Sequence, residues 1–189
     1  MSGSFCTFDA AIDALEKLCA EYKSVIPIMS ENAYSTDTRF GAAAGFRARI
    51  NAVCNAPIIH DIPAAEPIGP QKLLDILVVA PCTGNTLSKI AHGITDTCVT
   101  MAAKAHLRNN RPLLIAASSN DALGGGAVNL GALLGRKNVY FAPFYQDDPV
   151  DKPTSLVANL ALLPDAIDAA LTGRQVQPIF APPIGAPLQ

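Results

Sequence analysis

Four short segments of this 189-residue sequence are rich in glycine and in hydroxyl or amide side chains: residues 3–4, 35–40, 81–86 and 118–121. Small residues let a backbone approach a ligand closely, while hydroxyls and amides supply hydrogen-bond donors and acceptors. A metal would instead need clustered His, Cys or carboxylate side chains. The set therefore favours a planar cofactor that carries a phosphate, and we expect no metal site.

Helix capping is the competing interpretation of each segment. Ser, Thr, Asn and Asp cap helices and form turns by bonding nearby backbone amides. Thr38, Asn85 and Asp96 can each be explained in this way. Capping and ligand contact are equal alternatives at any single position, and only the four segments taken together favour a ligand.

Strand-like and helix-like patterns alternate along the chain. Continuous apolar runs at residues 76–80 and 113–117 are typical of strands buried on both faces. Further strand-like runs lie at 25–29 and 139–142, and helical patterns lie at 7–22, 38–55, 86–93, 96–109, 128–134 and 156–171. The alternation predicts an α/β fold with a mostly parallel sheet. Ligands of such sheets bind beyond the carboxyl ends of the strands, where the polar segments lie.

The first polar segment lacks a strand before it. A Gly-Ser turn that binds phosphate usually follows a strand and opens a helix, so that free backbone amides face the anion. Here residues 1–4 run almost directly into a helix. We therefore expect the sequence to begin late and to lack a first strand near the centre of the sheet. The remainder is expected to form one domain, residues 1–176, followed by a Pro-rich tail, residues 177–189.

Composition excludes several classes of protein. A net charge of -2 and a pI near 5.8 give no electrostatic footprint for nucleic acid. No apolar run reaches the roughly 18 residues needed to cross a membrane, so we expect a cytoplasmic protein. Only 16% of the residues are charged, against about 25% in an average soluble domain. Part of the surface is therefore expected to be covered by a ligand or by other protein chains.

Residues 75–96, DILVVAPCTGNTLSKIAHGITD, resemble a segment of the FMN-binding flavoprotein superfamily, which includes phosphopantothenoylcysteine decarboxylase. In that segment a buried strand ends in Ala-Pro, and an Asn-Thr pair opens a helix toward FMN. Further stretches resemble the dipicolinate synthase B-subunit family within it, namely residues 3–7, 38–41, 65–70, 101–105, 108–112, 119–123, 146–149 and 177–179. The resemblance covers nearly the whole chain.

This resemblance implies a three-layer, Rossmann-like sheet with helices on both faces, and FMN bound by the loops. Carried over position by position, it gives the candidate cofactor-binding residues Gly3, Ser4, Ser35, Thr38, Pro81, Thr83, Asn85, Thr86, Ser118, Ser119 and Asn120. Two departures concern the decarboxylases of the superfamily. Residues 118–120 share only Asn120 with the Pro-x-Met-Asn segment of the decarboxylases. Residues 66–69 read Glu-Pro-Ile-Gly, whereas the decarboxylases carry a histidine in the corresponding stretch.

Three histidines and two arginines are the side chains considered for catalysis and substrate binding. His60, His92 and His106 do not fit the decarboxylase position and are expected to be core or surface residues, so the catalytic residues stay unknown. Arg39 and Arg111 are candidates for binding a dicarboxylate, because guanidinium grips carboxylates through paired hydrogen bonds. An equal alternative is that each pairs with a local carboxylate, such as Asp37 or Asp121.

Dipicolinate synthases are oxidoreductases of spore-forming bacteria that consist of two different chains and convert dihydrodipicolinate to dipicolinate. The resemblance implies the FMN-binding chain of such an enzyme, in the mother-cell cytoplasm. Its partner would be the dehydrogenase-like A-chain of dipicolinate synthase, which uses NADP, and the chain would also form a homo-oligomer, a trimer or larger. Two alternatives stay open: a non-catalytic partner that stabilises the dehydrogenase-like chain, and an FMN-dependent cysteinyl decarboxylase.

Overall fold

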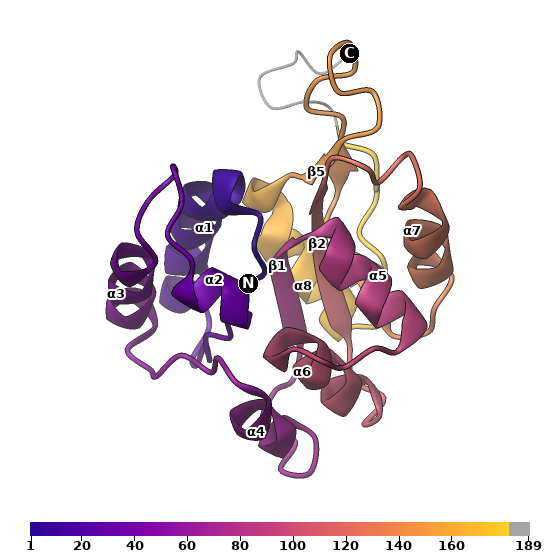
Figure 1. The fold of residues 1–189 in the computed structure, drawn as a ribbon. Coiled ribbons are helices and arrows are strands. Elements are labelled where there is room, and N and C mark those ends of the chain that lie inside the picture. Colours follow the sequence, from indigo (N-terminus) through magenta and orange to yellow (C-terminus); the bar gives the residue numbers. More distant parts are fainter. Residues whose placement is uncertain (182–189) are drawn as a thin grey trace.

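The computed structural model describes residues 1–181 and has a mixed sheet covered by helices on both faces (Figure 1). The strands are β1 Leu77–Cys82, β2 Leu113–Ser119, β3 Val139–Phe141, β4 Phe144–Tyr145 and β5 Leu156–Ala158. Strands β1 and β3 pair with β2 in parallel, whereas β5 pairs with β2 and β4 in antiparallel. The α/β class is confirmed, and the antiparallel additions β4 and β5 make the sheet mixed.

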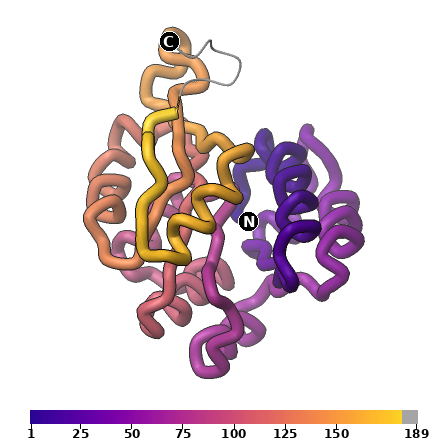
Figure 2. Tube along the Cα trace, turned by 180° about the vertical axis from the view of Figure 1, so that it is seen from behind, coloured from indigo at the N-terminus to yellow at the C-terminus, as the bar shows by residue number. Residues whose placement is uncertain are grey.

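Eight α-helices surround this sheet within the described residues: α1 Phe8–Glu21, α2 Glu31–Ser35, α3 Ala43–Cys54, α4 Ile62–Ala65, α5 Gly84–His92, α6 Cys98–Leu107, α7 Ala127–Leu134 and α8 Leu163–Leu171. Helices α1 and α8 cover one face, and α5, α6 and α7 cover the other (Figures 1 and 2). None of these helices has the length and apolarity that crossing a membrane would require.

Strand β2 explains the three layers, because its residues point alternately to the two faces. Leu113 and Ile115 pack with α5, α6 and α7, whereas Leu114 and Ala116 pack with α1 and α8. All four side chains are fully buried. A continuous apolar run is therefore what a strand between two helical layers needs, and the sequence prediction of this strand is confirmed.

The N-terminal part forms a separate packing layer beside the sheet. Phe8 and Ile12 of α1 pack against Met29, Ala33 of α2, and Phe46 and Ile50 of α3. The strand predicted at residues 25–29 is wrong in this structure, since only an isolated bridge joins Ile28 to Ile59. Across from this segment, β1 has no strand on its outer edge among the described residues.

Three other boundaries differ from the sequence prediction. The helix expected at 38–55 begins only at Ala43. Before it, the backbone N–H groups of Thr38 and Gly41 each donate to the carbonyl oxygen of the other, which forms a turn. The helix expected at 156–171 is a strand followed by α8, and Pro164 lies in the first turn of α8, where its missing N–H costs nothing. The first part of the expected tail pairs with β4 through Ile179 and Ala181, and residues 182–189 lie outside the described part.

His106 of α6 is a buried core histidine, with only 1% of its surface exposed. Its Nε2 lies 2.9 Å from the carbonyl oxygen of Pro112, which identifies Nε2 as the donor. Burial lowers the pKa of the imidazole below its usual 6.5, and the nearby Arg111 acts in the same direction. The folded protein therefore holds this side chain neutral, as expected for a core residue.

The buried imidazole predicts a pH-dependent stability. Below pH 6.5 the unfolded state binds a proton at His106 that the folded state resists, so the free energy of unfolding should fall as the pH falls. The loss should approach about 1.4 kcal/mol per pH unit at most. Urea unfolding at pH 5 to 8 measures it. His106→Gln should flatten the curve and the matched change of exposed His92→Gln should not; an unchanged curve in His106→Gln would contradict the assignment.

Candidate functional site

Three of the four polar segments meet beyond the carboxyl ends of β1 and β2. The hydroxyl oxygens of Ser4 and Ser118 lie 2.8 Å apart, which joins the N-terminal turn to the end of β2. Gly84, at the start of α5, lies against Ser119: a β-carbon placed on Gly84 would come within 2.5 Å of the Ser119 Oγ. We call residues 2–4, 83–86 and 118–120 the polar cradle.

Ser2 holds the cradle together and was missed by the sequence prediction. Its buried hydroxyl donates to the carbonyl oxygen of Pro81 and accepts from the backbone N–H of Thr83, both at 2.9 Å. Its backbone N–H donates to Pro81 as well, at 3.1 Å. Ser2 stands directly before the Gly-Ser turn of the first polar segment, so its position was the available signal. Its hydrogen bonds fasten that turn to the end of β1.

The first turn of α5 presents backbone amides to the cradle. Thr83 caps the helix, because its side chain accepts from the N–H of Thr86 at 3.2 Å. The hydroxyl groups of Thr83 and Thr86 are 3.0 Å apart. The N–H groups of Gly84 and Asn85 donate to no other described group. The start of a helix attracts anions through such amides and through the helix dipole.

No carboxylate competes for these donors inside the cradle. The nearest acidic residue along the chain, Asp121, accepts hydrogen bonds from the N–H groups of Gly125 and Gly126 at 3.2 and 3.1 Å. The exposed Asn120 is held through its carbonyl oxygen, which accepts from the Thr154 hydroxyl at 2.7 Å. The cradle is thus uncharged, rich in donors and partly open, a combination suited to a phosphate-bearing ligand.

The side chains of the fourth polar segment make local hydrogen bonds. The Ser35 hydroxyl donates to the carbonyl oxygen of Glu31 within α2, and the Thr38 hydroxyl accepts from the N–H of Phe40. Arg39 is exposed and lies over the ring of Phe40, 4.9 Å from its centre. Within the described residues, no hydrogen bond connects this segment to the polar cradle.

Arg111 lies at the other end of β2 from the polar cradle, just before the strand begins. Its guanidinium donates to the carbonyl oxygens of Lys72 and Leu74 and forms an ion pair with Asp75 at 3.3 Å. Arg111 therefore closes the turn that leads into β1. The whole length of β2 separates Arg111 from the polar cradle, and the partners of this arginine are those of the local-pairing alternative.

The other two histidines are also apart from the polar cradle. His60 stacks on the ring of Tyr34 with ring centres 3.8 Å apart. His92 lies in the last turn of α5, where its Nδ1 is 2.9 Å from the carbonyl oxygen of Ser88. Neither side chain bonds to a residue of the cradle, and the structure offers no histidine for acid-base catalysis there among residues 1–181.

The fold and the polar cradle define a flavoprotein-type α/β protein, and the chain belongs to the flavoprotein family, whose model matches residues 1–133. More particularly, the sequence is 46% identical over 180 residues to the B-subunit of dipicolinate synthase from Bacillus subtilis strain 168. That alignment covers 95% of this chain and 90% of the relative.

Solved structures agree with this assignment. The dipicolinate synthase B-subunit from Bacillus halodurans superimposes with a TM-score of 0.88 at 42% identity, covering 96% of this chain and 93% of the other. The DmrB protein of Burkholderia xenovorans in complex with FMN gives 0.65 at 20% identity, covering 90% and 92%. The second likeness concerns the fold alone.

Proposed function

We propose that this chain is the FMN-binding component of a dipicolinate synthase, which converts dihydrodipicolinate to dipicolinate during sporulation together with a dehydrogenase-like partner chain that uses NADP. The observation that carries the FMN site is the convergence of Ser4, Thr83 and Ser118 on the open first turn of α5. The substrate and the partner chain rest on the similarity to the two Bacillus proteins.

The donor set fits the phosphate of FMN. The backbone N–H groups of Gly84 and Asn85 would bind phosphate oxygens, with hydroxyls of Ser4 and Ser118 beside them. Gly84 leaves space that any β-carbon would take from Ser119, so the backbone itself forms part of the cradle. The Asp121 carboxylate accepts hydrogen bonds from the N–H groups of Gly125 and Gly126, so it would not compete with a phosphate for the donors of the cradle.

When bound, FMN supplies a two-electron acceptor, which suits the dehydrogenation of a dihydropyridine ring. The protein's part is to hold and orient. Asn85, Ser119 and Asn120 would supply amide and hydroxyl groups for the flavin ring. Arg39 is the remaining candidate for a substrate carboxylate, because its guanidinium is exposed and has no carboxylate partner among the described residues.

Self-assembly into a trimer or larger oligomer belongs to the same proposal. Helix α6 buries most of its apolar side chains in its own core and offers little apolar surface to another copy. The exposed apolar residues Val128 and Leu134 of α7, together with Leu123 before it, offer a better contact surface. Sedimentation of the Val128→Asp variant as a smaller particle than wild type would support that choice of surface.

An FMN titration tests the site. Removing one hydroxyl contact in Ser4→Ala or Ser118→Ala should weaken binding by about fivefold to tenfold, the equivalent of roughly 1 to 1.5 kcal/mol. Quenching of flavin fluorescence measures the affinity. Ser88→Ala, one turn further along α5, is the matched control and should bind like wild type. Equal affinity in all four proteins would remove the cradle from the proposal.

Reconstitution tests the reaction itself. This chain and the dehydrogenase-like partner are mixed with dihydrodipicolinate, with and without FMN and NADP, and dipicolinate is followed by its ultraviolet absorbance. The proposal expects product formation to need both chains and FMN. Full activity without FMN, together with tight association between the two chains, would instead identify this chain as a non-catalytic stabilising partner.

A further inference from the structure

Helix α3 lies on the outside of the molecule, with α1 between it and the sheet (Figures 1 and 2). The two helices meet along matching stripes of residues at helical spacing. The stripe on α1 consists of Phe8, Ile12, Leu15 and Cys19. The stripe on α3 consists of Phe46, Ile50 and Cys54. Each stripe therefore ends in a cysteine.

The contacts between the two stripes run from aromatic rings at one end to thiols at the other. The rings of Phe8 and Phe46 meet edge to face, with their centres 5.2 Å apart. The isoleucines one turn further along are fully buried in the same cluster. At the far end the Cys19 thiol donates to the Cys54 sulfur, and the two Sγ atoms are 3.5 Å apart. Core packing thus brings the two sulfur atoms together.

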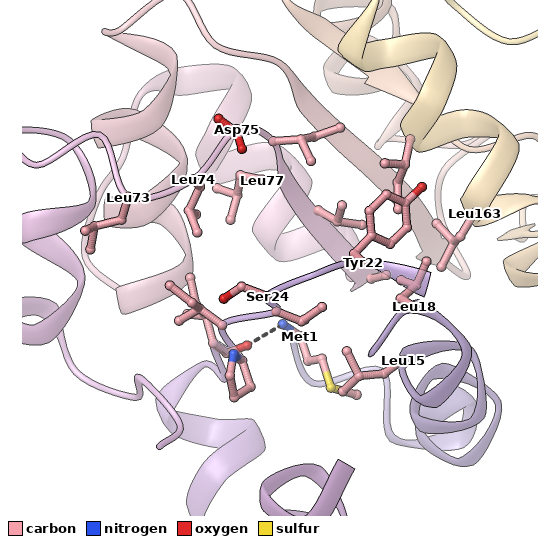
Figure 3. A pocket seen from close by; sticks show the side chains of 18 of the residues that line it. Met1, Leu15, Leu18, Tyr22, Ser24, Leu73, Leu74, Asp75, Leu77 and Leu163 are labelled. Carbon is pink, nitrogen blue, oxygen red and sulfur yellow. Dashed lines mark hydrogen bonds between the residues drawn. The ribbon is translucent and has the colours of Figure 1, made fainter. Parts of the chain in front are cut away.

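The opposite side of α1 is held against the sheet. Ala14 and Leu18 are buried with Leu114 and Ala116 of β2. Leu18 and Tyr22 also line the apolar groove of about 450 Å³ that lies beside β1 (Figure 3). A bond between α1 and α3 would therefore connect the outer helix to a helix that is part of the sheet core.

The polar contacts between α1 and α3 are exposed. The Arg49 guanidinium of α3 forms ion pairs with Asp9 at 2.6 Å and with Asp13 at 3.2 Å. Exposed ion pairs of this kind contribute little to stability, because water and salt screen them. The attachment of α3 is therefore one that a covalent bond can strengthen measurably.

The thiol pair differs from the other cysteines of the chain. Cys19 and Cys54 are half-buried, so a small reagent in solution can reach them. Cys82 and Cys98 are buried, and burial raises the pKa of each thiol to about 12. Cys6 is exposed and has no second cysteine beside it within residues 1–181. Cys19 and Cys54 are therefore the cysteines that are placed to react with each other.

We propose that Cys19 and Cys54 are a reversible disulfide site that fastens α3 to α1. A sulfur–sulfur bond is about 2 Å long, so the two atoms have to approach by roughly 1.5 Å, which is within the reach of side-chain rotation. The co-reactant is a small-molecule disulfide, RSSR. The Cys19 sulfur bonds to one sulfur of RSSR and RSH leaves; the Cys54 sulfur then displaces the second RSH from Cys19. The protein loses two electrons and two protons, and RSSR is reduced to two thiols.

The two thiols react in a fixed order. Burial, together with the adjacent Cys19 thiol, raises the pKa of Cys54 to about 12, so Cys54 is almost entirely protonated at neutral pH. Cys19 therefore forms the first bond to the reagent. Cys54 can still complete the exchange, because the sulfur atoms are neighbours and the second step is intramolecular. The mixed disulfide on Cys19 should therefore be converted and should not accumulate.

The test uses the full chain with Cys6→Ser, which removes the exposed thiol and keeps the pair. After incubation with oxidised glutathione, the intact mass should fall by that of two hydrogen atoms. The bond joins residues 35 positions apart, so the melting temperature should rise by roughly 5 to 15 °C. A phosphine reductant should reverse both changes. The oxidised and reduced forms are compared within one protein, so no further substitution can disturb the result.

The matched control carries Cys54→Ser in the same background. It should gain the mass of one glutathione at Cys19, and its melting temperature should not rise. An unchanged mass, or a glutathione adduct that accumulates on the protein with both cysteines, would overturn the proposal. So would a disulfide that forms without raising the melting temperature, because the sulfur atoms would then have met only after the packing of α1 and α3 was disrupted.

Discussion

Gly84→Val is expected to weaken FMN binding by about 100-fold while leaving the fold intact. A β-carbon at this position comes within 2.5 Å of the Ser119 Oγ, so the Ser119 hydroxyl must rotate away from its place in the cradle. The two methyl groups of valine would also crowd the N–H groups of Gly84 and Asn85, which are the proposed phosphate donors. Steric overlap of this kind costs roughly 1 to 3 kcal/mol, which corresponds to about 5-fold to 150-fold in affinity.

Flavin fluorescence titration measures this loss, and a thermal melt shows that the protein still folds. Gly45→Val is the matched control, because Gly45 lies in the exposed face of α3 and a β-carbon there meets no atom within 4 Å. It should bind FMN like wild type. Wild-type affinity in Gly84→Val would show that the phosphate does not bind at the start of α5.

Gly126→Ala is expected to lower the free energy of unfolding by about 1 to 3 kcal/mol. Its β-carbon would lie 2.7 Å from the backbone carbonyl oxygen of Asp121 and 3.4 Å from the Cα of Ala122. These are backbone atoms, which cannot rotate aside as the Ser119 hydroxyl can. The same turn carries the hydrogen bonds of Gly126 N–H to the Asp121 carbonyl and carboxylate, at 3.0 and 3.1 Å.

The loss at Gly126 should appear as a melting temperature about 2 to 12 °C lower, for a chain of this size. Gly131→Ala provides the matched control within α7, since a β-carbon at Gly131 meets nothing within 4 Å. Alanine is the better helix former, so this control should gain about 0.5 to 1 kcal/mol. Opposite signs for the two glycines are the result expected; a gain in stability for both variants would mean that helix propensity alone governs both.

Stability and function are linked at the turn that follows β2. Ser118 and Ser119 belong to the cradle, and Asp121 braces the loop directly after them. A change that loosens the Asp121 turn, such as Gly126→Ala, should therefore also weaken FMN binding, though less than Gly84→Val does. The ratio of the two losses separates direct contact with the cofactor from support of the loop.

The sequence by itself determined the layers of this protein. The unbroken apolar runs that became β1 and β2 have no polar face, so each strand had to be buried between two sets of helices. The polar segments after these strands were predicted to meet, because the carboxyl ends of parallel neighbours share one edge of the sheet. Ser4 and Ser118 do meet there, and Ser2 joins the same N-terminal turn to Pro81 and Thr83.

Tertiary structure decided what depends on distant neighbours. Residues 25–29 have the pattern of a strand, yet a strand needs a partner, and within residues 1–181 they form a single isolated bridge, between Ile28 and Ile59. Leu156–Ala158 continued a helical pattern, but pairing with β2 and β4 made it a strand. Arg111 was chosen for its charge, and only the fold placed its guanidinium on the carbonyls before β1. The chemistry of a side chain can be predicted from its residue type. Strand pairing, and the direction in which a side chain points, depend on parts of the chain far away in sequence.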